Sequence, residues 1–495
     1  MSLYRWSVGV AAVAALCALA TPAFAGNGQG SGSLADPAKA HNAVADQPPS
    51  VTSTCFWGVP AGPLDGVNIL GPETNVAYWY DTFQLPAGAR IVLHGQFPHS
   101  RFTSLTSYGT VNGIRGVALG GLSDFEINPD PGSTNPFRSG TQRTAPNRSY
   151  TVTLSGQVDP GPGNRAPNTF YVGQAGQTGQ TQTIELILRV YRADKNRDMA
   201  GGVPLPEPTL VRADGTTASG QAACDGVNAQ SGFDKLNTTG LGITDAAYLQ
   251  LLNLPRPNPN PPPATLPALP THPAVNPILF YRFFNQPRLA EPFFQGTVAQ
   301  GQIAGLPAAI SPGLYPTPAN AYVYAYADRT FGPDPNGHNI LVLHAKLPTH
   351  PRTFDRNPDN DSAGKQVRYW SLCNYGAIAN PPLVPANTDC LFDEEIPTDS
   401  QGFYDIVVSL PEDRPSNAVT RCGAAWMDWT LQGDGVPGGH ERLINLVMRN
   451  QLSAASFAQA ADKVLTPGTE KQVMQDYLPA GTYMTKAQFE SRGCK

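Results

Sequence analysis

The chain contains one ordered series of apolar blocks twice, and this duplication constrains its fold more than any other feature. Ile91-Val92-Leu93-His94-Gly95 in the first half corresponds to Leu341-Val342-Leu343-His344-Ala345 in the second. At least seven such blocks keep their order along the chain, while the loops between them differ in length. The sequence therefore predicts two related modules in tandem, which we place at residues 51–253 and 276–495.

Most of the repeated blocks are short runs of valine, isoleucine, leucine, tyrosine and phenylalanine, which is typical of β-strands. The chain also holds 49 glycines and 49 prolines, residues that break helices and suit turns. We predict a mainly β protein of two antiparallel β-sandwich or jelly-roll-like modules, each with a short C-terminal helix, near Thr244–Asn253 and near Ser453–Val464. The proline-rich residues 254–275 are predicted to be a linker between the modules.

The first 25 residues have the features of a signal peptide. Arg5 supplies a positive charge, Val8–Leu19 is apolar, and Ala23-Phe24-Ala25 fits the small-x-small cleavage pattern. The polar residues 26–50 would then form a flexible tail. We expect an exported protein, periplasmic or extracellular, with no integral membrane segment after cleavage.

Six cysteines remain outside the signal peptide, an even number that suits disulfide bonds in an exported chain. Cys55 and Cys224 are the two cysteines of the first module and bracket its strands. Cys373 and Cys390 fall on consecutive strands, where antiparallel neighbours bring the Cβ atoms close together. These considerations predict the pairs Cys55–Cys224, Cys373–Cys390 and, from the cysteines that are left, Cys422–Cys494.

The second module carries the strings Arg368-Tyr369-Trp370-Ser371-Leu372-Cys373 and Glu412-Asp413-Arg414-Pro415-Ser416-Asn417-Ala418. With these strings it resembles a family of uncharacterised secreted bacterial proteins. The first module, around Asn75, Tyr78 and Arg101-Phe102, is more loosely similar to β-rich bacterial domains of unknown function. The resemblance implies exported β-modules and carries over no catalytic residue.

Each module also repeats an arginine followed by a group of carboxylates. Arg101 precedes Asp124 and Glu126, and Arg368 precedes the run Asp393-Glu394-Glu395. An arginine that faces carboxylates of the next strand can form a bidentate ion pair. The pair would either fix the strand register or form an anion-binding site at the module junction, with Arg101, Arg368, Glu126 and Glu394 as binding residues.

Histidine and aromatic residues supply further candidates. His94 and His344 occupy equivalent strand positions, and they would face one shared cleft if the modules pack about a pseudo-twofold axis. There His94, His344 and Asp428 could act as acids or bases, although a repeat copies structural histidines as readily as functional ones. Trp79 and Trp429, from two aromatic clusters, are candidates for stacking on a ligand if they are not core residues.

One polar loop has oxygen ligands at alternate positions, which suits Ca²⁺. These residues are Asp355, Asn357, Asp359 and Asp361. The loop departs from the EF-hand pattern, so the alternative is a solvated polar loop inserted between two strands.

The sequence excludes several functional classes. A formal net charge of −5 without a basic run argues against a nucleic-acid partner. Nucleophile-elbow, Walker and dinucleotide motifs are lacking. We expect a protein that requires no cofactor and binds a small apolar or glycan-like ligand in a cleft between the modules. The alternative is a cofactor-independent or metal-assisted enzyme, a hydrolase, lyase or isomerase, that uses histidine and arginine–carboxylate residues at the junction.

Overall fold

The computed structural model describes residues 53–58, 60, 72–111, 114–161, 163–232, 276–283, 315–354, 363–376, 388–429, 443–465 and 468–494. These residues are mainly β and form four sheets, two in each module, which confirms the predicted fold class. Both modules belong to one compact unit, Ser33–Lys495. The signal peptide, the tail, the proline-rich linker, the predicted helix near Thr244–Asn253 and the predicted Ca²⁺ ligands Asp355, Asn357, Asp359 and Asp361 lie outside the described residues.

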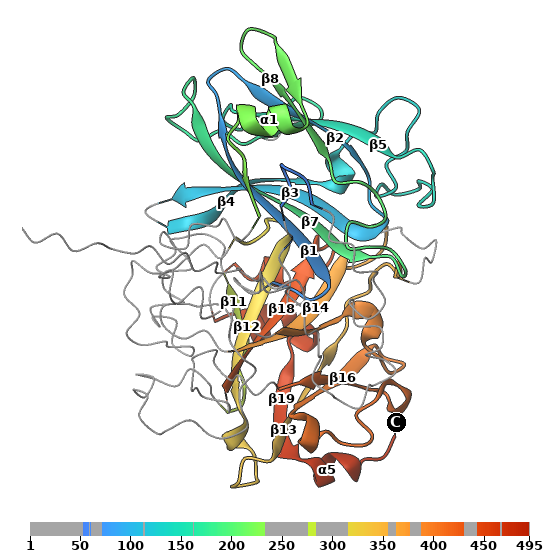
Figure 1. Cartoon of the computed structure of the whole chain (residues 1–495). Coiled ribbons are helices and arrows are strands. Elements are labelled where there is room, and N and C mark those ends of the chain that lie inside the picture. The colour runs from blue at the N-terminus through green and yellow to red at the C-terminus, as the bar shows by residue number, and fades with distance from the viewer. Residues whose placement is uncertain are drawn as a thin grey trace, which may run out of the picture. The chain divides into compact units, whose positions relative to one another are not determined.

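The first module is coloured blue to green in Figure 1 and contains two five-stranded sheets. We call the sheet of order β10-β1-β7-β3-β4 its junction sheet and the sheet of order β6-β5-β2-β8-β9 its outer sheet. The strands are β1 (Val76–Leu85), β2 (Arg90–Gln96), β3 (Ser100–Val111), β4 (Ile114–Ser123), β5 (Ser149–Ser155), β6 (Thr169–Tyr171), β7 (Gln182–Ala193), β8 (Glu207–Val211), β9 (Thr217–Ser219) and β10 (Gln230–Ser231).

The second module, yellow to red in Figure 1, repeats this arrangement. Its junction sheet has the order β11-β12-β18-β14-β15, and its outer sheet has the order β17-β16-β13-β19. The strands are β11 (Tyr281–Phe283), β12 (Asn320–Asp328), β13 (Asn339–Lys346), β14 (Tyr369–Gly376), β15 (Thr388–Phe392), β16 (Phe403–Ser409), β17 (Ala424–Asp428), β18 (Leu443–Gln451) and β19 (Ala480–Thr485).

Strand register confirms that the blocks matched in the sequence are structurally equivalent. His94 pairs with Thr151 between β2 and β5, and His344 pairs with Asp405 between β13 and β16. Strands β6 and β17 each run parallel to their neighbours β5 and β16, so both modules depart from a purely antiparallel sandwich at the same edge. The outer sheet of the second module has no strand equivalent to β9 among the described residues, but the other strands share their order and register, so a position on them has a defined counterpart in the other module.

Each module closes around its own hydrophobic core, filled by the apolar side chains between its two sheets. Trp79 on β1 and Trp429 after β17 are both fully buried in these cores. The Trp57 indole also lies in the first core and donates to the Pro206 carbonyl at 2.8 Å. The interpretation of Trp79 and Trp429 as core residues is therefore the one that the structure supports.

Helices are few and short in the described residues. The α-helices are α1 (Gln221–Gly226), α4 (Glu470–Met474) and α5 (Lys486–Glu490), and the 3-10 helices are η2 (Asp124–Glu126), η6 (Arg329–Phe331), η7 (Asp393–Glu395), η8 (Pro411–Asp413), η9 (Thr420–Cys422), η10 (Ala461–Lys463) and η11 (Gln475–Tyr477). The helix predicted near Ser453–Val464 is wrong in its position, because this stretch forms turns and only η10. Its apolar residues Phe457, Ala460 and Val464 have a helical spacing, but successive turns suffice to bury them in the second core.

The three disulfide bonds form the predicted pairs, Cys55–Cys224, Cys373–Cys390 and Cys422–Cys494. Cys373 and Cys390 are directly opposite each other in the β14–β15 register, as expected for neighbouring strands. Cys55 connects the segment that carries Phe56 and Trp57 to α1. Cys494 connects the chain end to η9, beside the outer sheet of the second module.

Candidate functional site

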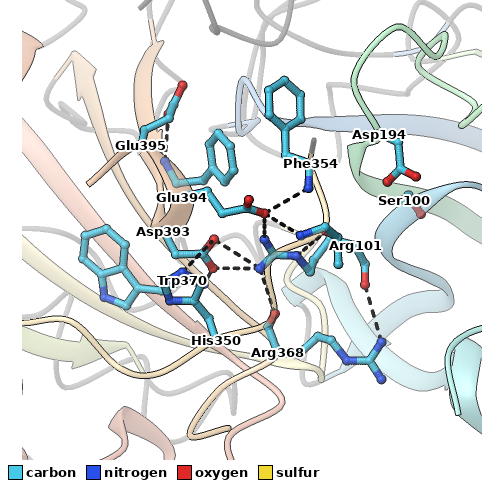
Figure 2. A network of polar contacts seen from close by, with 12 residues as sticks. Ser100, Arg101, Asp194, His350, Phe354, Arg368, Trp370, Asp393, Glu394 and Glu395 are labelled. Carbon is cyan, nitrogen blue, oxygen red and sulfur yellow. Dashed lines mark hydrogen bonds and ion pairs between the residues drawn. The ribbon is translucent and has the colours of Figure 1, made fainter. Parts of the chain in front are cut away.

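Arg101, near the start of β3, extends its guanidinium from the first module to the second (Figure 2). Its Nη1 donates to both carboxylate oxygens of Asp393 at 3.1 and 3.0 Å, and its Nη2 donates to Oε1 of Glu394 in a short hydrogen bond. Its Nε donates to the hydroxyl of Thr353 at 2.7 Å. The Arg101 and Asp393 side chains are fully buried, so this ion pair is removed from solvent.

Arg368 makes the reciprocal connection with looser geometry. Its Nη1 lies 3.9 Å from Oδ1 of Asp124 in the first module and donates to the Arg101 carbonyl at 3.4 Å. Nη1 of Arg101 donates in turn to the Arg368 carbonyl at 3.2 Å. The expectation that each arginine pairs with the carboxylates of its own module is therefore wrong, since both arginines pair across the junction.

Backbone amides explain why the ion pairs cross. Oδ2 of Asp124 accepts a hydrogen bond from the Thr103 amide at 2.8 Å, and Oδ2 of Asp393 accepts one from the Trp370 amide at 2.9 Å. Each aspartate is thus held by the strand of its own module. Asp393 also accepts hydrogen bonds from Arg101, whereas Oδ1 of Asp124 lies 3.9 Å from Arg368 and has no hydrogen-bond partner in the described part of the chain. Glu126 does not take part, because its Oε2 accepts from the Ser123 amide at 2.7 Å.

Burial raises the pKa of the Asp124 carboxyl to about 7, and the more distant Arg368 only partly opposes this. An unfolded aspartate has a pKa near 3.9, so between about pH 4 and pH 7 the folded state binds the additional proton. Stability from this group is therefore present at low pH and is lost as the pH rises towards 7.

Asp124→Asn is accordingly expected to stabilise the protein at pH 8, by roughly 1–4 kcal/mol, and to have little effect at pH 5. Asp393→Asn is the matched control, and it is expected to destabilise the protein at both pH values because Asp393 accepts two hydrogen bonds from Arg101. Urea unfolding of the three proteins at pH 5 and pH 8 measures the effect. A pH-independent difference between Asp124→Asn and the parent chain would contradict the assignment.

A second pair of buried arginines lies on the junction sheets, each between two tyrosines. The Arg189 guanidinium on β7 is 5.5 Å from the ring of Tyr78 and 5.6 Å from that of Tyr108. Arg449 on β18 has the same arrangement, at 5.5 Å from Tyr322 and 5.7 Å from Tyr375. Register makes these residues counterparts, because Tyr78 pairs with Arg189 as Tyr322 pairs with Arg449. We call them the first and second Tyr–Arg–Tyr sets.

The polar partners of the two sets differ. Arg449 donates to Sγ of Cys373 and to the hydroxyl of Tyr375, and its Nε lies 3.5 Å from Oε2 of Glu73. Glu73 also accepts a short hydrogen bond from the Tyr369 hydroxyl. Burial raises the pKa of the Glu73 carboxyl, and Arg449 and Tyr369 oppose this rise. Arg189 instead donates from Nη2 to the Tyr315 carbonyl at 2.7 Å.

The histidine candidates lie on the outer sheets, which are not the sheets that carry the junction network. Nδ1 of His344 is 2.7 Å from Oδ1 of the buried Asp405, and its ring stacks on Phe403. His94 is exposed and lies 3.4 Å from the Thr151 hydroxyl. In the contacts of the described residues the structure does not bring the two histidines together, so equivalence in the repeat did not imply a shared cleft.

Asp428 is separate from both histidines. It ends β17 and pairs in register with Ser409, four residues beyond the partner of His344 on β16. Its amide donates to Oδ2 of Asp389 at 2.6 Å. Within the described part of the chain there is also no group of three histidine, cysteine or carboxylate side chains that could hold a metal ion.

Sequence reasoning missed the two Tyr–Arg–Tyr sets and Glu73. One signal was present: Ile187-Leu188-Arg189 and Val447-Met448-Arg449 place an arginine directly after a run of apolar strand residues at equivalent points of the repeat. Burying a charge at such a position costs free energy unless the charge has a partner, so these arginines were candidates for a buried ion pair or a ligand site. Glu73 precedes the first strand and has no acidic counterpart in the second module, so the repeat could not identify it.

Fold and junction together define a two-module β-sandwich protein with buried charged groups between its modules. No family model matches the sequence, and no curated protein sequence matches it. Among solved structures, an uncharacterised protein from Burkholderia cenocepacia is similar over 91% of this chain and 86% of its own, with 11% identity and a TM-score of 0.41. A protein from Vibrio parahaemolyticus is similar over 84% of this chain and 88% of its own, with 11% identity and a TM-score of 0.32.

No helix in the described residues is long and apolar enough to cross a membrane.

Proposed function

We propose that this chain is an exported binding protein that holds a small polar ligand between its two junction sheets. Three disulfide bonds support export, because disulfides persist mainly in oxidising compartments. The proposal keeps the glycan-like ligand class predicted from the sequence and moves away from an apolar one, since the surfaces that meet at the junction carry tyrosine, arginine and serine side chains.

The observation that carries the proposal is a group of buried polar atoms on the first junction sheet. The hydroxyls of Ser104 and Thr106 and Nη1 of Arg189 are buried and have no hydrogen-bond partner in the described part of the chain. A buried polar group without a partner costs about 1–3 kcal/mol. A ligand that supplies these hydrogen bonds recovers this free energy, and native proteins satisfy nearly all their buried polar groups.

The chemistry of the surrounding side chains favours a hydroxylated molecule. Ser104 is directly opposite Arg189 in the β3–β7 register, and Thr106 is opposite Ile187, so their side chains lie on one sheet face. The ring of Tyr78, which is only half-buried, provides a flat surface on which a sugar ring can stack. Hydroxyl donors beside aromatic rings are suited to a small glycan-like ligand.

Native mass spectrometry of the protein isolated from its own host tests this proposal. We expect a bound small molecule, which is lost when the protein is denatured and refolded. Because a ligand at 100 times its Kd stabilises by about 2.7 kcal/mol, the refolded protein is expected to melt roughly 5–10 °C lower. An isolated mass equal to that of the disulfide-bonded chain, together with an unchanged Tm after refolding, would refute the proposal.

A further inference from the structure

We propose that Arg189 is an anion subsite of this chain and binds the carboxylate of a small, hydroxylated carboxylic acid. The inference rests on the proposed function and adds the charge of the ligand and the residue that reads it. It comes from comparing the two Tyr–Arg–Tyr sets, one of which is supplied with a carboxyl group by the chain itself.

Glu73 supplies the carboxyl group that lies beside Arg449 in the second Tyr–Arg–Tyr set. The Glu73 carboxyl lies beside Nε of Arg449 at 3.5 Å and accepts from the Tyr369 hydroxyl, although Glu73 belongs to the first module. The second Tyr–Arg–Tyr set therefore takes a carboxyl group that comes from outside its own module. A ligand carboxylate at the first set would occupy the equivalent position.

The first set is built in the same way but receives no carboxyl group. The counterpart of Glu73 is Thr317: the Glu73 amide donates to the Tyr78 hydroxyl at 3.1 Å, and the Thr317 amide donates to the Tyr322 hydroxyl at 3.2 Å. The segment that contains Thr317 reaches the first set, because the neighbouring Tyr315 carbonyl accepts from Arg189. A threonine therefore stands where a glutamate would face Arg189.

Arg189 is buried and has an unused hydrogen-bond donor. It is 3% exposed, and within the described part of the chain the titratable groups that act on it most strongly are tyrosines and not carboxylates. Its Nη1 has no hydrogen-bond partner there, and the Ser104 hydroxyl opposite it is equally unpaired. Glu185, on the same strand face, is four residues or about 13 Å along β7 and accepts from the Tyr315 hydroxyl at 2.7 Å.

An arginine in this environment selects carboxylates. A buried cation without an anion is costly, and a guanidinium forms strong charge-assisted hydrogen bonds with a carboxylate. The two flanking tyrosine rings leave the guanidinium edge as its donor surface, and the Ser104 and Thr106 hydroxyls offer further hydrogen bonds to a hydroxylated ligand. A neutral ligand of the same shape would leave the arginine without a counter-ion.

Thermal unfolding in the presence of matched probes tests the inference. Acetate, benzoate and galacturonate are compared at 10 mM and constant ionic strength with their neutral counterparts acetamide, benzamide and galactose. We expect at least one carboxylate, most strongly galacturonate, to raise the Tm in a saturable way while its neutral counterpart does not. Absence of a carboxylate-specific rise in Tm would overturn the proposal.

Two variants and one control variant locate the effect. Arg189→Gln is expected to abolish the carboxylate-dependent rise, whereas Arg414→Gln, which removes an arginine 4.4 Å from the Trp426 ring in the outer part of the second module, is expected to keep it. Thr317→Glu is expected to remove the response by supplying Arg189 with an internal carboxylate, and this variant retains the arginine should Arg189→Gln fail to fold. A response that survives in either Arg189→Gln or Thr317→Glu would overturn the assignment.

The outcomes separate this inference from the proposed function. If galactose and galacturonate stabilise the protein equally, or if the protein from its own host carries a neutral ligand, the chain is a binding protein but Arg189 is not a carboxylate site. If the protein from its own host carries no ligand and none of the probes stabilises it, both proposals fail.

Discussion

Replacing Arg101 with methionine is expected to lower the free energy of unfolding by about 3–5 kcal/mol, because the change leaves two carboxylates buried without their cation. Asp393 is fully buried and the Glu394 side chain is 8% exposed, so water cannot replace the guanidinium. The chain segments that carry these residues come from different modules, which means that the loss falls on the connection between them. Urea unfolding followed by tryptophan fluorescence measures the change.

The exposed pair Arg165–Asp159 provides the matched control. Its side chains are 40% and 31% exposed, and an ion pair of this kind contributes about 0–1 kcal/mol. Arg165→Met should therefore cost little. Adding Asp393→Asn and Glu394→Gln to Arg101→Met should recover part of the loss, since neutral groups are less costly to bury than charged ones. An Arg101→Met variant no less stable than Arg165→Met would show that the junction ion pairs contribute nothing net.

The repeat made much of the fold predictable. Matching His94 with His344 and Arg101 with Arg368 placed these residues at equivalent positions of the two modules, and the register of the strands that carry or directly follow them agrees. The alternation of side chains along a strand and the repeated order of the blocks can both be read directly from the sequence. The disulfides followed for the same reason, since Cys373 and Cys390 sit on consecutive strands of one sheet.

The junction could not be predicted in the same way. Whether Arg101 pairs with Asp124 or with Asp393 depends on which sheet of one module faces the other, and the sequence of a single strand does not encode that choice. The identical residue types in both modules made the within-module pairing look sufficient. Trp79 was ambiguous for a related reason, because one aromatic cluster places neighbouring residues on opposite faces of β1, with Trp79 in the core and Tyr78 at the junction.

The difference between the modules is more informative about function than their similarity. Glu73 in the first module has Thr317 as its counterpart in the second. Arg449 therefore has a carboxyl group beside it, and Arg189 does not receive the equivalent one. A purely structural repeat gains nothing from leaving Arg189 without an acidic partner, because a buried unpaired cation lowers stability. This asymmetry favours the first Tyr–Arg–Tyr set as a ligand site over Arg101, whose guanidinium donates hydrogen bonds to Thr353, Asp393 and Glu394 within the chain.

Removing the Cys55–Cys224 disulfide by alanine substitution at both positions is expected to cost about 5 kcal/mol, the largest loss among the three disulfides. The bond closes a sequence separation of 169 residues, compared with 72 for Cys422–Cys494 and 17 for Cys373–Cys390. Loop-closure entropy grows with the logarithm of this length, which gives about 4 kcal/mol for the second and about 3 kcal/mol for the third.

A local effect adds to the loss at Cys55. The bond holds the short segment 53–58 against α1. This segment supplies Phe56 and Trp57, which are both fully buried in the first core. Without the bond, the segment is still held by the packing of these two rings and by the hydrogen bond from the Trp57 indole to Pro206. Midpoints of urea unfolding for the three double-alanine variants test the order, and hydrogen exchange tests whether the segment detaches. The opposite result would be that the Cys373→Ala, Cys390→Ala variant is the least stable of the three. In that case the packing around these two buried sulfur atoms, and not loop-closure entropy, would determine how much each disulfide stabilises the protein.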